Sequence, residues 1–375
     1  MSTASCDEYL ASKAVRFVAA VEMSKGLPAY KRLSLEELHA AAEGLNLYAP
    51  IPEVIPAFTK PKSGGVRVVC DCGPRYRTGH RLVTNLLKPH FLLRPFQYDR
   101  KGSFGVHRAV LDLVALIEQG YNYVEHLDAK SFFGSFRADK LIPELPLPKA
   151  VVECVVLGTH AKIKIAKKAT YPWAINHNNK LIEKARLGLL QGAASSPLVG
   201  AMMVSRLNWT APTDVVLISF VDDFYLVAKT ASALKDAAIA LRAAFEALPG
   251  GQFTLRTKGA ARHVSDGVNL FGHCVTAIGS KIVIELTLAN ETAADERFEA
   301  LEKHAQLFAG QYVKSPTEKW RALALDAIGR LLGSAAAWAE AFALCVGIED
   351  NLKIVQNSAF KAAWRQIMTA AKRHA

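Results

Sequence analysis

The stretch Val215-Val216-Leu217-Ile218-Ser219-Phe220-Val221-Asp222-Asp223-Phe224-Tyr225-Leu226-Val227 places two adjacent carboxylates between two apolar runs. Both runs are rich in β-branched, aliphatic and aromatic residues, which is typical of buried strands, and the gap between them is the size of a turn. The stretch therefore predicts a β-hairpin with acids at its tip. Charges beside so much hydrocarbon are costly unless something offsets them, and a divalent cation such as Mg²⁺ would do so. An ordinary acidic β-turn is the alternative, because Asp is common in turns.

The composition indicates a globular protein with a substantial core. The chain has 375 residues, of which 51% are hydrophobic, and a chain of this length is expected to form two or three packed subdomains. No apolar run approaches the roughly 20 residues of a membrane span. Residues 1–10 lack the basic region and apolar core of a secretion signal. We therefore expect a cytoplasmic protein that does not associate with membranes.

The six cysteines show no spacing typical of a zinc site, so we expect structural thiols. The net charge of +12 is more informative, because it is unevenly distributed. The segment from Lys60 to Arg108 contains eleven Lys or Arg against two acids, Asp71 and Asp99. Such a segment favours a phosphate-rich partner. A solvated basic face is the alternative.

Local patterns predict an α+β protein. Residues 1–48 have a helical pattern, in which Ser34 and Glu37 form a capping box. A hairpin is predicted over 57–71, turning at Ser63-Gly64-Gly65. Further helices are predicted over 79–88, 106–119, 132–141, after Pro197, 232–248 and from 289 onwards, and strands over 121–127, 252–257, 269–276 and 281–286. We expect an N-terminal helical extension (1–56), a core (57–288) and a C-terminal helical region (289–375).

Asp128 stands at the end of the strand predicted over 121–127. A carboxylate at this place is open to a cleft and is held by a rigid element. If the strand lies beside the acidic hairpin, Asp128 and Asp222 can share two metal ions about 4 Å apart, the arrangement that clamps both oxygens of a phosphoryl transfer. The alternative is a surface Asp that caps the next helix.

A loop of small residues runs from Gly188 to Pro197. Small residues allow a backbone to approach a ligand closely, and the N-terminus of the following helix favours an anion. A helix is predicted to follow Ser195-Ser196-Pro197, with a Ser at the cap and Pro at the first helical position. Gln191 offers hydrogen bonds to a base or a sugar.

Taken in order, these pieces resemble the reverse transcriptase family. The matching residues are Asp128 with Phe132 and Phe133, the Gln-Gly to Ser-Pro loop at 191–197, and the aromatic-x-Asp-Asp box at 220–223. Residues 255–258 and 270–272 match more weakly, as the Lys-bearing motif and the primer-grip hairpin. The resemblance runs from about 57 to 276. It implies a right-hand polymerase fold, with fingers, a palm of antiparallel sheet and helices, and a C-terminal helical thumb over 289–375.

The resemblance also assigns roles to individual residues. Asp128, Asp222 and Asp223 would bind two Mg²⁺ ions, or Mn²⁺ as a substitute, with Asp222 contacting both ions and Asp223 in support. Phe133 would act as a steric gate against ribonucleotides, and Lys258 would protonate the leaving pyrophosphate; a core phenylalanine and a solvated lysine are the alternatives. The remaining implied contacts are those of Lys62 and Arg67 with the triphosphate, of Gln191 and Gly192 with the nucleotide or template, and of Lys60, Arg75, Arg77, Arg100, Lys101, Phe271 and Gly272 with nucleic acid.

The implied activity is RNA-directed DNA synthesis from deoxynucleoside triphosphates, on an RNA template or with a dedicated non-coding RNA. Phe220, Val221 and Leu190 replace the family's usual Tyr, Ala and Pro, and no clear Asn-Ala-x-x-His element of retrons is present. Since the helical segment suits a thumb and leaves no room for a ribonuclease H or a homing endonuclease, we expect a compact bacterial type, retron-like or associated with antiphage defence. The missing retron element favours the defence-associated type. A second copy or an effector protein could bind to it. The alternatives are a template-independent or protein-primed nucleotidyltransferase and a catalytically silent nucleic-acid-binding protein.

Overall fold

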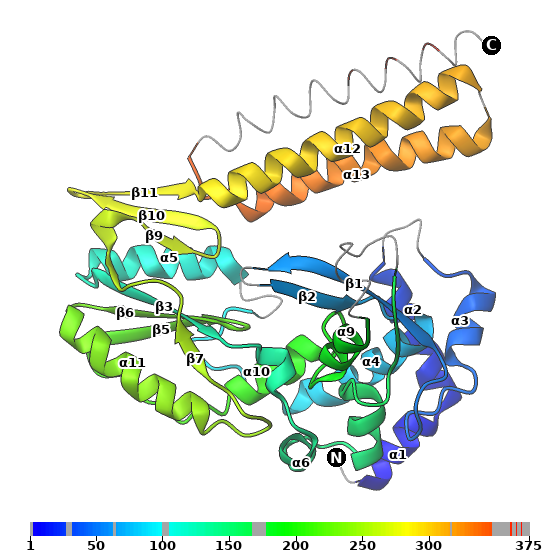
Figure 1. Cartoon of the computed structure of the whole chain (residues 1–375), viewed down its shortest axis with the longest axis horizontal. Coiled ribbons are helices and arrows are strands. Elements are labelled where there is room, and N and C mark those ends of the chain that lie inside the picture. Colours follow the sequence, from blue (N-terminus) through cyan, green and yellow to red (C-terminus); the bar gives the residue numbers. More distant parts are fainter. Residues whose placement is uncertain are drawn as a thin grey trace. The chain divides into compact units, whose positions relative to one another are not determined.

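The computed structural model describes residues 3–27, 32–62, 65–99, 105–166, 178–315 and 317–346, with 361, 365 and 369. It is a mixed α/β protein with antiparallel sheets and helices (Figure 1). The chain divides into two compact units. The first consists of Met1–Asp99, His126–Leu226 and Lys235–Gly259, and the second of Arg100–Glu125, Val227–Leu234 and Ala260–Ala375. These units cut across the boundaries expected at 56 and 288, since the chain passes repeatedly from one to the other.

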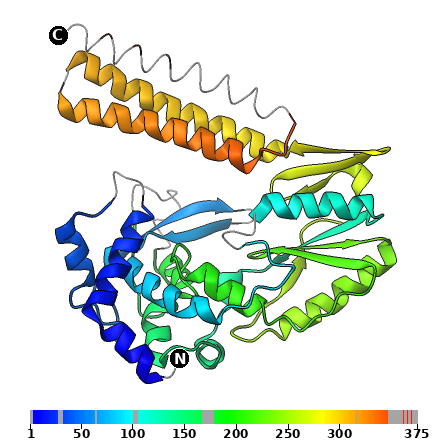
Figure 2. The ribbon, with the colours of Figure 1, turned by 180° about the vertical axis from the view of Figure 1, so that it is seen from behind.

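The N-terminal helices pack on a helix of the first unit's core. Helix α2 (Lys13–Lys25) lies against α3 (Leu35–Ala42) and α4 (Pro74–Leu87), as Figure 2 shows, and is preceded by α1 (Thr3–Ala11). The predicted capping box is confirmed, because the Glu37 amide donates to Ser34 Oγ and the Ser34 amide to Glu37 Oε2. Helix α4 begins five residues before the predicted start at Gly79. Pro74 occupies its first turn, and the Glu53 carboxylate accepts the amide of Tyr76.

The basic hairpin is confirmed as β1 (Val54–Lys62) and β2 (Gly65–Cys70), with Lys60 opposite Arg67. Its turn at Ser63 and Gly64 lies outside the described residues. A third strand that was not predicted, β4 (Lys162–Ile165), pairs in parallel with β1, and α9 (Asn178–Arg186) packs on this sheet.

The acidic hairpin is also confirmed, as β5 (Val215–Phe220) and β6 (Asp223–Ala228). It belongs to a sheet of order β5-β6-β3-β7, with β3 (Tyr123–Ala129) in the middle and β7 (Leu255–Thr257) antiparallel to it. The predicted strand over 252–257 is thus shorter than expected. The short strand β8 (Arg262–His263) also pairs with β3.

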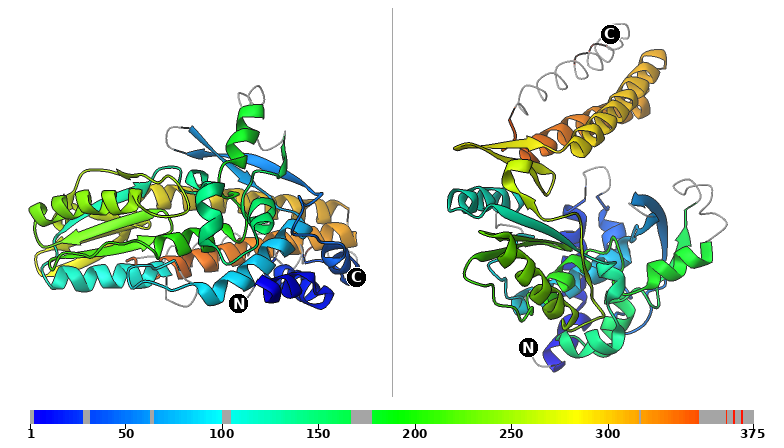
Figure 3. Two further views of the ribbon diagram at one scale, coloured as in Figure 1. Left: turned by 90° about the horizontal axis from the view of Figure 1, so that it is seen from below. Right: turned by 60° about the vertical axis from the view of Figure 1, so that its left-hand side comes forward.

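One face of this sheet is covered by α11 (Ala231–Glu246), visible in Figure 3. The ring of Phe245 contacts that of Phe224 on β6, and Arg242 donates to the hydroxyl of Thr257 on β7. Because successive side chains of a strand point to opposite faces, the alternate residues Asp223, Asp128 and Arg256 lie on the other face.

The helix predicted over 132–141 is wrong. The chain forms a 3₁₀ turn η3 (Phe132–Ser135), one turn of helix α6 (Ala138–Leu141) and a further 3₁₀ turn η4 (Ile142–Glu144). Phe136 (φ −66°, ψ 143°) and Arg137 (φ −128°, ψ 136°) are extended and interrupt the helix, and the rings of Phe132 and Phe136 pack in a buried aromatic cluster. The next elements are α7 (Lys149–Val151), the π-helical turn η5 (Val152–Val156) and α10 (Ser196–Val204).

The predicted helix is confirmed as α10, but the predicted serine cap is not formed at the residue that precedes it, Ser195. Its backbone is helical, with φ −82° and ψ −23°, and its side chain accepts no hydrogen bond from the helix. Instead, its hydroxyl lies 2.8 Å from Nδ1 of the fully buried His80 of α4. Burial lowers the pKa of His80 to about 4, so a neutral ring joins α4 to the start of α10.

The second unit contains a three-stranded sheet and two long helices. The strand predicted over 269–276 is divided into β9 (Val268–Leu270) and β10 (His273–Ile278) by a tight turn at Phe271 (φ 48°) and Gly272 (φ 89°). Strand β11 (Lys281–Leu286) completes this sheet. The helices of this unit are α5 (Gly105–Glu118), α12 (Leu288–Lys314) and α13 (Glu318–Ala341), and it also contains the short 3₁₀ turn η7 (Val264–Asp266). A further 3₁₀ turn, η2 (Lys88–His90), belongs to the first unit.

Helices α12 and α13 pack through small residues such as Ala305, Ala309 and Ala324. Among the described residues, α13 is the one helix long and apolar enough to cross a membrane, with 28% of its most apolar window buried. One such helix is weak evidence for membrane association, since a packed helix of a soluble protein passes the same test.

The cysteines are free thiols, and all but Cys274 are buried. Burial raises the pKa of Cys70 to about 11 and that of Cys72 to about 12, so both are protonated at neutral pH. Inert buried thiols agree with the structural role expected for them.

Candidate active site at the acidic hairpin

The tip of the acidic hairpin is strained and is fastened to β3. Val221 has a φ of 56°, a left-handed conformation that is exceptional for a β-branched residue and costs about 1–3 kcal/mol. The amide of Ala129 donates to the carbonyl of Asp222 at 2.8 Å. Strain of this kind concentrates at functional sites. Within the described residues the non-glycine positive φ values are those of Ser131, Val221 and Phe271, one in each of three predicted motifs.

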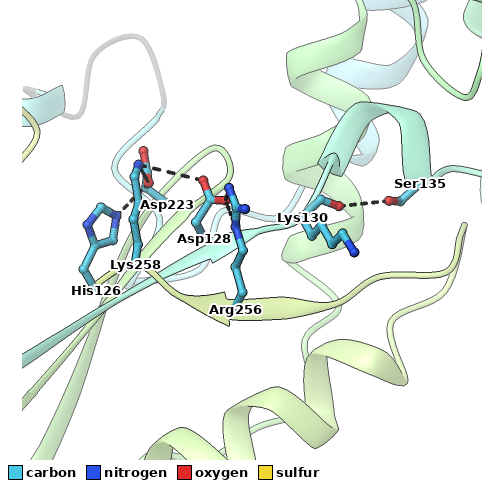
Figure 4. A network of polar contacts seen from close by, with 7 residues as sticks. All are labelled: His126, Asp128, Lys130, Ser135, Asp223, Arg256 and Lys258. Carbon is cyan, nitrogen blue, oxygen red and sulfur yellow. Dashed lines mark hydrogen bonds and ion pairs between the residues drawn. The ribbon is translucent and has the colours of Figure 1, made fainter. Parts of the chain in front are cut away.

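Six side chains come together on the sheet face opposite α11. Each of three neighbouring strands contributes two residues at i and i+2, which places both on the same face. The pairs are His126 and Asp128 of β3, Asp223 and Tyr225 of β6, and Arg256 and Lys258 at the end of β7. Figure 4 shows the polar members of this group. The register sets Asp128 opposite Arg256, and the Lys258 amide donates to the His126 carbonyl.

Asp128 is a buried carboxylate with two cations beside it. The residue is 5% exposed, and Arg256 donates from Nε at 2.9 Å and from Nη2 at 2.8 Å to the same oxygen, Oδ2. Lys258 Nζ lies 3.8 Å from the other oxygen, Oδ1. A buried carboxylate without such partners would be strongly destabilising, so these two cations offset the cost of burying Asp128.

Asp223 is held by a histidine and a lysine. His126 Nε2 lies 2.7 Å from Asp223 Oδ1, and Lys258 Nζ lies 3.0 Å from the same oxygen. Burial alone would raise the pKa of Asp223, but the hydrogen bond from His126 and the charge of Lys258 outweigh burial, and the pKa is lowered. Lys258 therefore bridges Asp128 and Asp223.

Asp222 is in the opposite electrostatic situation. Burial is the largest cause of its raised pKa, followed by the charge of Asp223 and, more weakly, that of Asp128, while Arg67 of β2 lowers it. Within the described part of the chain, no cation lies within ion-pair distance of its carboxylate. The three predicted carboxylates are thus close enough to interact, and Arg67 reaches them electrostatically from the basic hairpin.

The donors suit a hard cation, although their present arrangement does not. Carboxylate oxygens are the preferred ligands of Mg²⁺, which binds through one or two of them together with substrate phosphates. Among the described residues, however, no group of three or more His, Cys, Asp or Glu side chains is placed to hold one metal ion. Arg256 and Lys258 occupy the carboxylates, so a metal ion would have to displace them.

The Gln191 loop lies tightly between two backbone segments. The Leu189 amide donates to the carbonyl of Phe133, and the Cys70 amide at the end of β2 donates to the carbonyl of Gln191. Gly188 and Gly192 have φ values of 62° and 104°, and a Cβ at either would lie about 2 Å from a backbone oxygen, 2.1 and 2.2 Å respectively. Gln191 Oε1 is buried without a hydrogen-bond partner among the described residues. Such an atom calls for a ligand or a water molecule.

The two phenylalanines after Asp128 occupy different environments. Phe132 is 2% exposed and contacts the rings of Phe136, Phe245 and Phe253, so it belongs to the core. Phe133 is half-buried and meets only Phe132 edge-on among the ring contacts described. The residue predicted as a gate is therefore the one that is not fully packed.

The remaining predicted residues are not among the contacts of this site that the structure describes. Arg77 pairs with Asp71 and donates to the carbonyl of Cys72, and Arg75 donates to that of Ala40, so both are engaged by the protein. Lys60 is exposed on β1, with its Nζ 5.7 Å from the centre of the Phe58 ring. Phe271 and Gly272 lie in the second unit. The side chain of Lys62 and the residues Arg100 and Lys101 lie outside the described part of the structure.

His126 and Arg256 have no role predicted from the sequence. His126 stands two residues before the predicted Asp128, and Arg256 two residues before the predicted Lys258. Residues two apart on a strand share a face, so the strand period was the signal that would have found both.

The fold and the site together define a mixed α/β protein with an acidic, cation-paired cluster on one face of a sheet. No protein-family model matches the chain, and no curated protein matches it either. Among solved structures, apo telomerase from Candida tropicalis, truncated from its C-terminal domain, is 15% identical with a TM-score of 0.34, over 62% of this chain and 55% of that one.

Two further telomerase structures are similar at the same level. Telomerase from Candida albicans in complex with the TWJ fragment of telomeric RNA is 11% identical with a TM-score of 0.40, over 93% of this chain and 59% of that one. Apo telomerase from Candida tropicalis is 11% identical with a TM-score of 0.38, over 86% of this chain and 64% of that one. The chain thus spans less than two thirds of each of these structures. TM-scores of this size do not establish a shared fold, so the function proposed below rests on the site residues.

Proposed function

We propose that this protein is an RNA-directed DNA polymerase that adds deoxynucleotides by two-metal phosphoryl transfer. The observation that supports this most strongly is that Asp128, Asp222 and Asp223 lie close enough to interact electrostatically. Asp128 lies on β3 and Asp223 on the neighbouring strand β6, and Asp222 lies in the strained turn that leads into β6. An ordinary acidic turn requires neither a valine in a left-handed conformation nor a lysine that bridges two carboxylates. In this proposal the first unit contains fingers and palm, and the helices α12 and α13 act as the thumb.

The three carboxylates would hold two Mg²⁺ ions, which when bound would stabilise the attacking and leaving oxygens as Lewis acids. The chain's own residues then have distinct tasks. Arg256 and Lys258 pair with Asp128, and Lys258 also with Asp223, before loading. Both cations are about half exposed, so their long side chains can leave. Once released, the two cations are available to phosphate oxygens, with Lys258 as the donor of a proton to pyrophosphate. Arg67 can fork two triphosphate oxygens.

Two further residues would select the substrate. The half-buried ring of Phe133 would crowd a ribose 2′-hydroxyl and so favour deoxynucleotides. Gln191 would use its unpaired Oε1 as an acceptor for the base, the sugar or the template strand, while Gly192 keeps its loop close to β2.

The biological setting is a further part of the proposal. The motifs fit a compact bacterial enzyme, retron-like or associated with antiphage defence, working in the cytoplasm with a template or dedicated non-coding RNA. The net charge of +12 and the exposed Lys60 and Arg67 of the basic hairpin support a polyanionic partner.

A second candidate is favoured by one specific observation. Asp128 pairs with Arg256 and Lys258, and Asp223 pairs with Lys258 and contacts His126. A protein that binds no metal ion would keep its carboxylates in these contacts. This candidate is a catalytically silent protein that binds nucleic acid through its basic surface.

The deciding experiment measures incorporation of labelled deoxynucleotides by purified protein with Mg²⁺ and its co-purified RNA. Asp222→Asn should abolish incorporation, whereas the matched control Asp236→Asn, which makes the same change on the exposed surface of α11, should leave it intact. Incorporation that survives Asp222→Asn would refute the two-metal mechanism. No incorporation by the unmodified protein, with RNA binding retained, would favour the silent binder, and synthesis that resists ribonuclease and follows no template would favour the terminal transferase.

A further inference from the structure

His126 makes the shortest contact to the hairpin acids, and the proposed reaction does not use it. Its Nε2 lies 2.7 Å from Asp223 Oδ1, and its side chain is 20% exposed. It stands two residues before Asp128 on β3, so one strand carries both a carboxylate of the site and the histidine that contacts another.

The imidazole ring is fixed in orientation as well as in position. It stacks on the ring of Tyr225, with centroids 4.1 Å apart and planes 17° from parallel. Tyr225 is 2% exposed and follows Asp223 by two residues on β6, so the ring that orients His126 and the carboxylate that it contacts belong to one rigid strand. A hydrogen bond from a stacked ring has little freedom to change direction.

The contacts to Asp223 are asymmetric. His126 and Lys258 both reach Oδ1, and no hydrogen bond or ion pair to Oδ2 is present among the described residues. When Lys258 leaves for a phosphate, only His126 still holds Oδ1. The second oxygen, which has no hydrogen bond or ion pair among the described residues, is then available to a cation.

We propose that His126 is a positioning residue that holds Asp223 by Oδ1 and presents Oδ2 to the metal. This inference rests on the proposed function, because it concerns the same carboxylates. Residues that orient metal ligands in this way typically contribute 10- to 100-fold to metal affinity. The role requires an N–H at Nε2, which both the charged ring and the Nε2-protonated tautomer of the neutral ring have, and so does not depend on the charge of the imidazole.

The test is Mn²⁺ binding to the full chain, measured without nucleotide by electron paramagnetic resonance of the free ion. His126→Phe keeps a ring to stack on Tyr225 but removes the donor, and should weaken binding about 10- to 100-fold. His126→Gln restores a donor and should recover most of the affinity. His263→Phe is the control: His263 lies on β8, also beside β3, and meets Tyr123 edge-on, but contacts no carboxylate. It should bind Mn²⁺ like the unmodified protein.

Activity assays provide the second measurement. If His126 only positions Asp223, His126→Phe should need more Mg²⁺ for half-maximal synthesis and should recover kcat at saturating Mg²⁺. Equal Mn²⁺ affinity in His126→Phe and unmodified protein overturns the assignment while leaving the polymerase proposal standing. A complete absence of Mn²⁺ binding by the unmodified protein overturns both. Should His126→Phe misfold, two-bond ¹H–¹⁵N spectra of the unmodified protein decide, because a ring protonated only at Nδ1 cannot donate to Asp223 and would refute the role.

Discussion

Replacing Gly192 by alanine tests whether the Gln191 loop must touch the end of β2. A Cβ on Gly192 would lie 2.2 Å from the Cys70 carbonyl oxygen, 3.2 Å from its carbon and 3.3 Å from its nitrogen. Ordinary van der Waals contact begins at about 3.4 Å, so the loop or the strand would have to move by about 1 Å. The opposing atoms are backbone, which cannot rotate away as a side chain can.

The expected loss has two parts. The left-handed φ of 104° strains any L-residue by about 1–3 kcal/mol. The clash adds about 1–3 kcal/mol of overpacking, and a weakened hydrogen bond from the Cys70 amide to Gln191 about 0.5–1.5 kcal/mol. Gly259→Ala isolates the first part, because Gly259 has a similar φ of 115° and nothing within 4 Å of its Cβ position.

The two variants should therefore differ by about 2–4 kcal/mol, or about 5–15 °C in the melting temperature of a unit of this size. Thermal denaturation followed by circular dichroism measures the difference, and urea titration checks it. Equal melting temperatures for Gly192→Ala and Gly259→Ala would show that the Gln191 loop can move away from β2 without loss of stability. This result would refute the requirement for close contact between Gly192 and Cys70. Gly192→Ala should also bind deoxynucleotides more weakly, since Gln191 moves with the loop.

Three further outcomes are expected. The folded pKa of Asp222 is raised above its unfolded value, so its contribution to stability is lost as pH rises above about 4. Without metal, Asp222→Asn should therefore melt at a higher temperature than the unmodified protein at pH 7 and show little difference at pH 4, and a lower melting temperature at pH 7 would contradict this. Val221→Gly relieves a left-handed β-branched residue and should change the free energy of unfolding by less than about 1 kcal/mol, since glycine's added flexibility offsets the relief, whereas a larger loss in urea titrations would mean that the valine side chain is needed for packing. Phe133→Ala should admit ribonucleotides in primer-extension assays at little cost in stability, whereas Phe132→Ala should destabilise the protein by about 3–5 kcal/mol. If Phe133→Ala still rejects ribonucleotides as the unmodified protein does, Phe133 is not the steric gate.

Local signals predicted the elements that lie nearest the site. The apolar runs around Asp222 and Asp223 are sufficient to specify a hairpin, because strand alternation and turn length are properties of neighbouring residues. The capping box at Ser34 and the basic hairpin are local for the same reason. The prediction failed where distant groups compete with local preference. At Ser195 the hydroxyl pairs with His80, 115 residues away, in place of the helix N-terminus.

The sequence by itself determined the acidic hairpin, the small-residue loop and the residue types that suit a metal-dependent reaction. Only the tertiary structure decided what each carboxylate touches. Asp128 meets Arg256 across 128 residues, and Asp223 meets His126 across 97. These contacts depend on the register between β3 and its neighbours, since a slip of one residue would turn every side chain of a strand to the opposite face. Because register is set by packing of the whole sheet against α11, no local pattern encodes it.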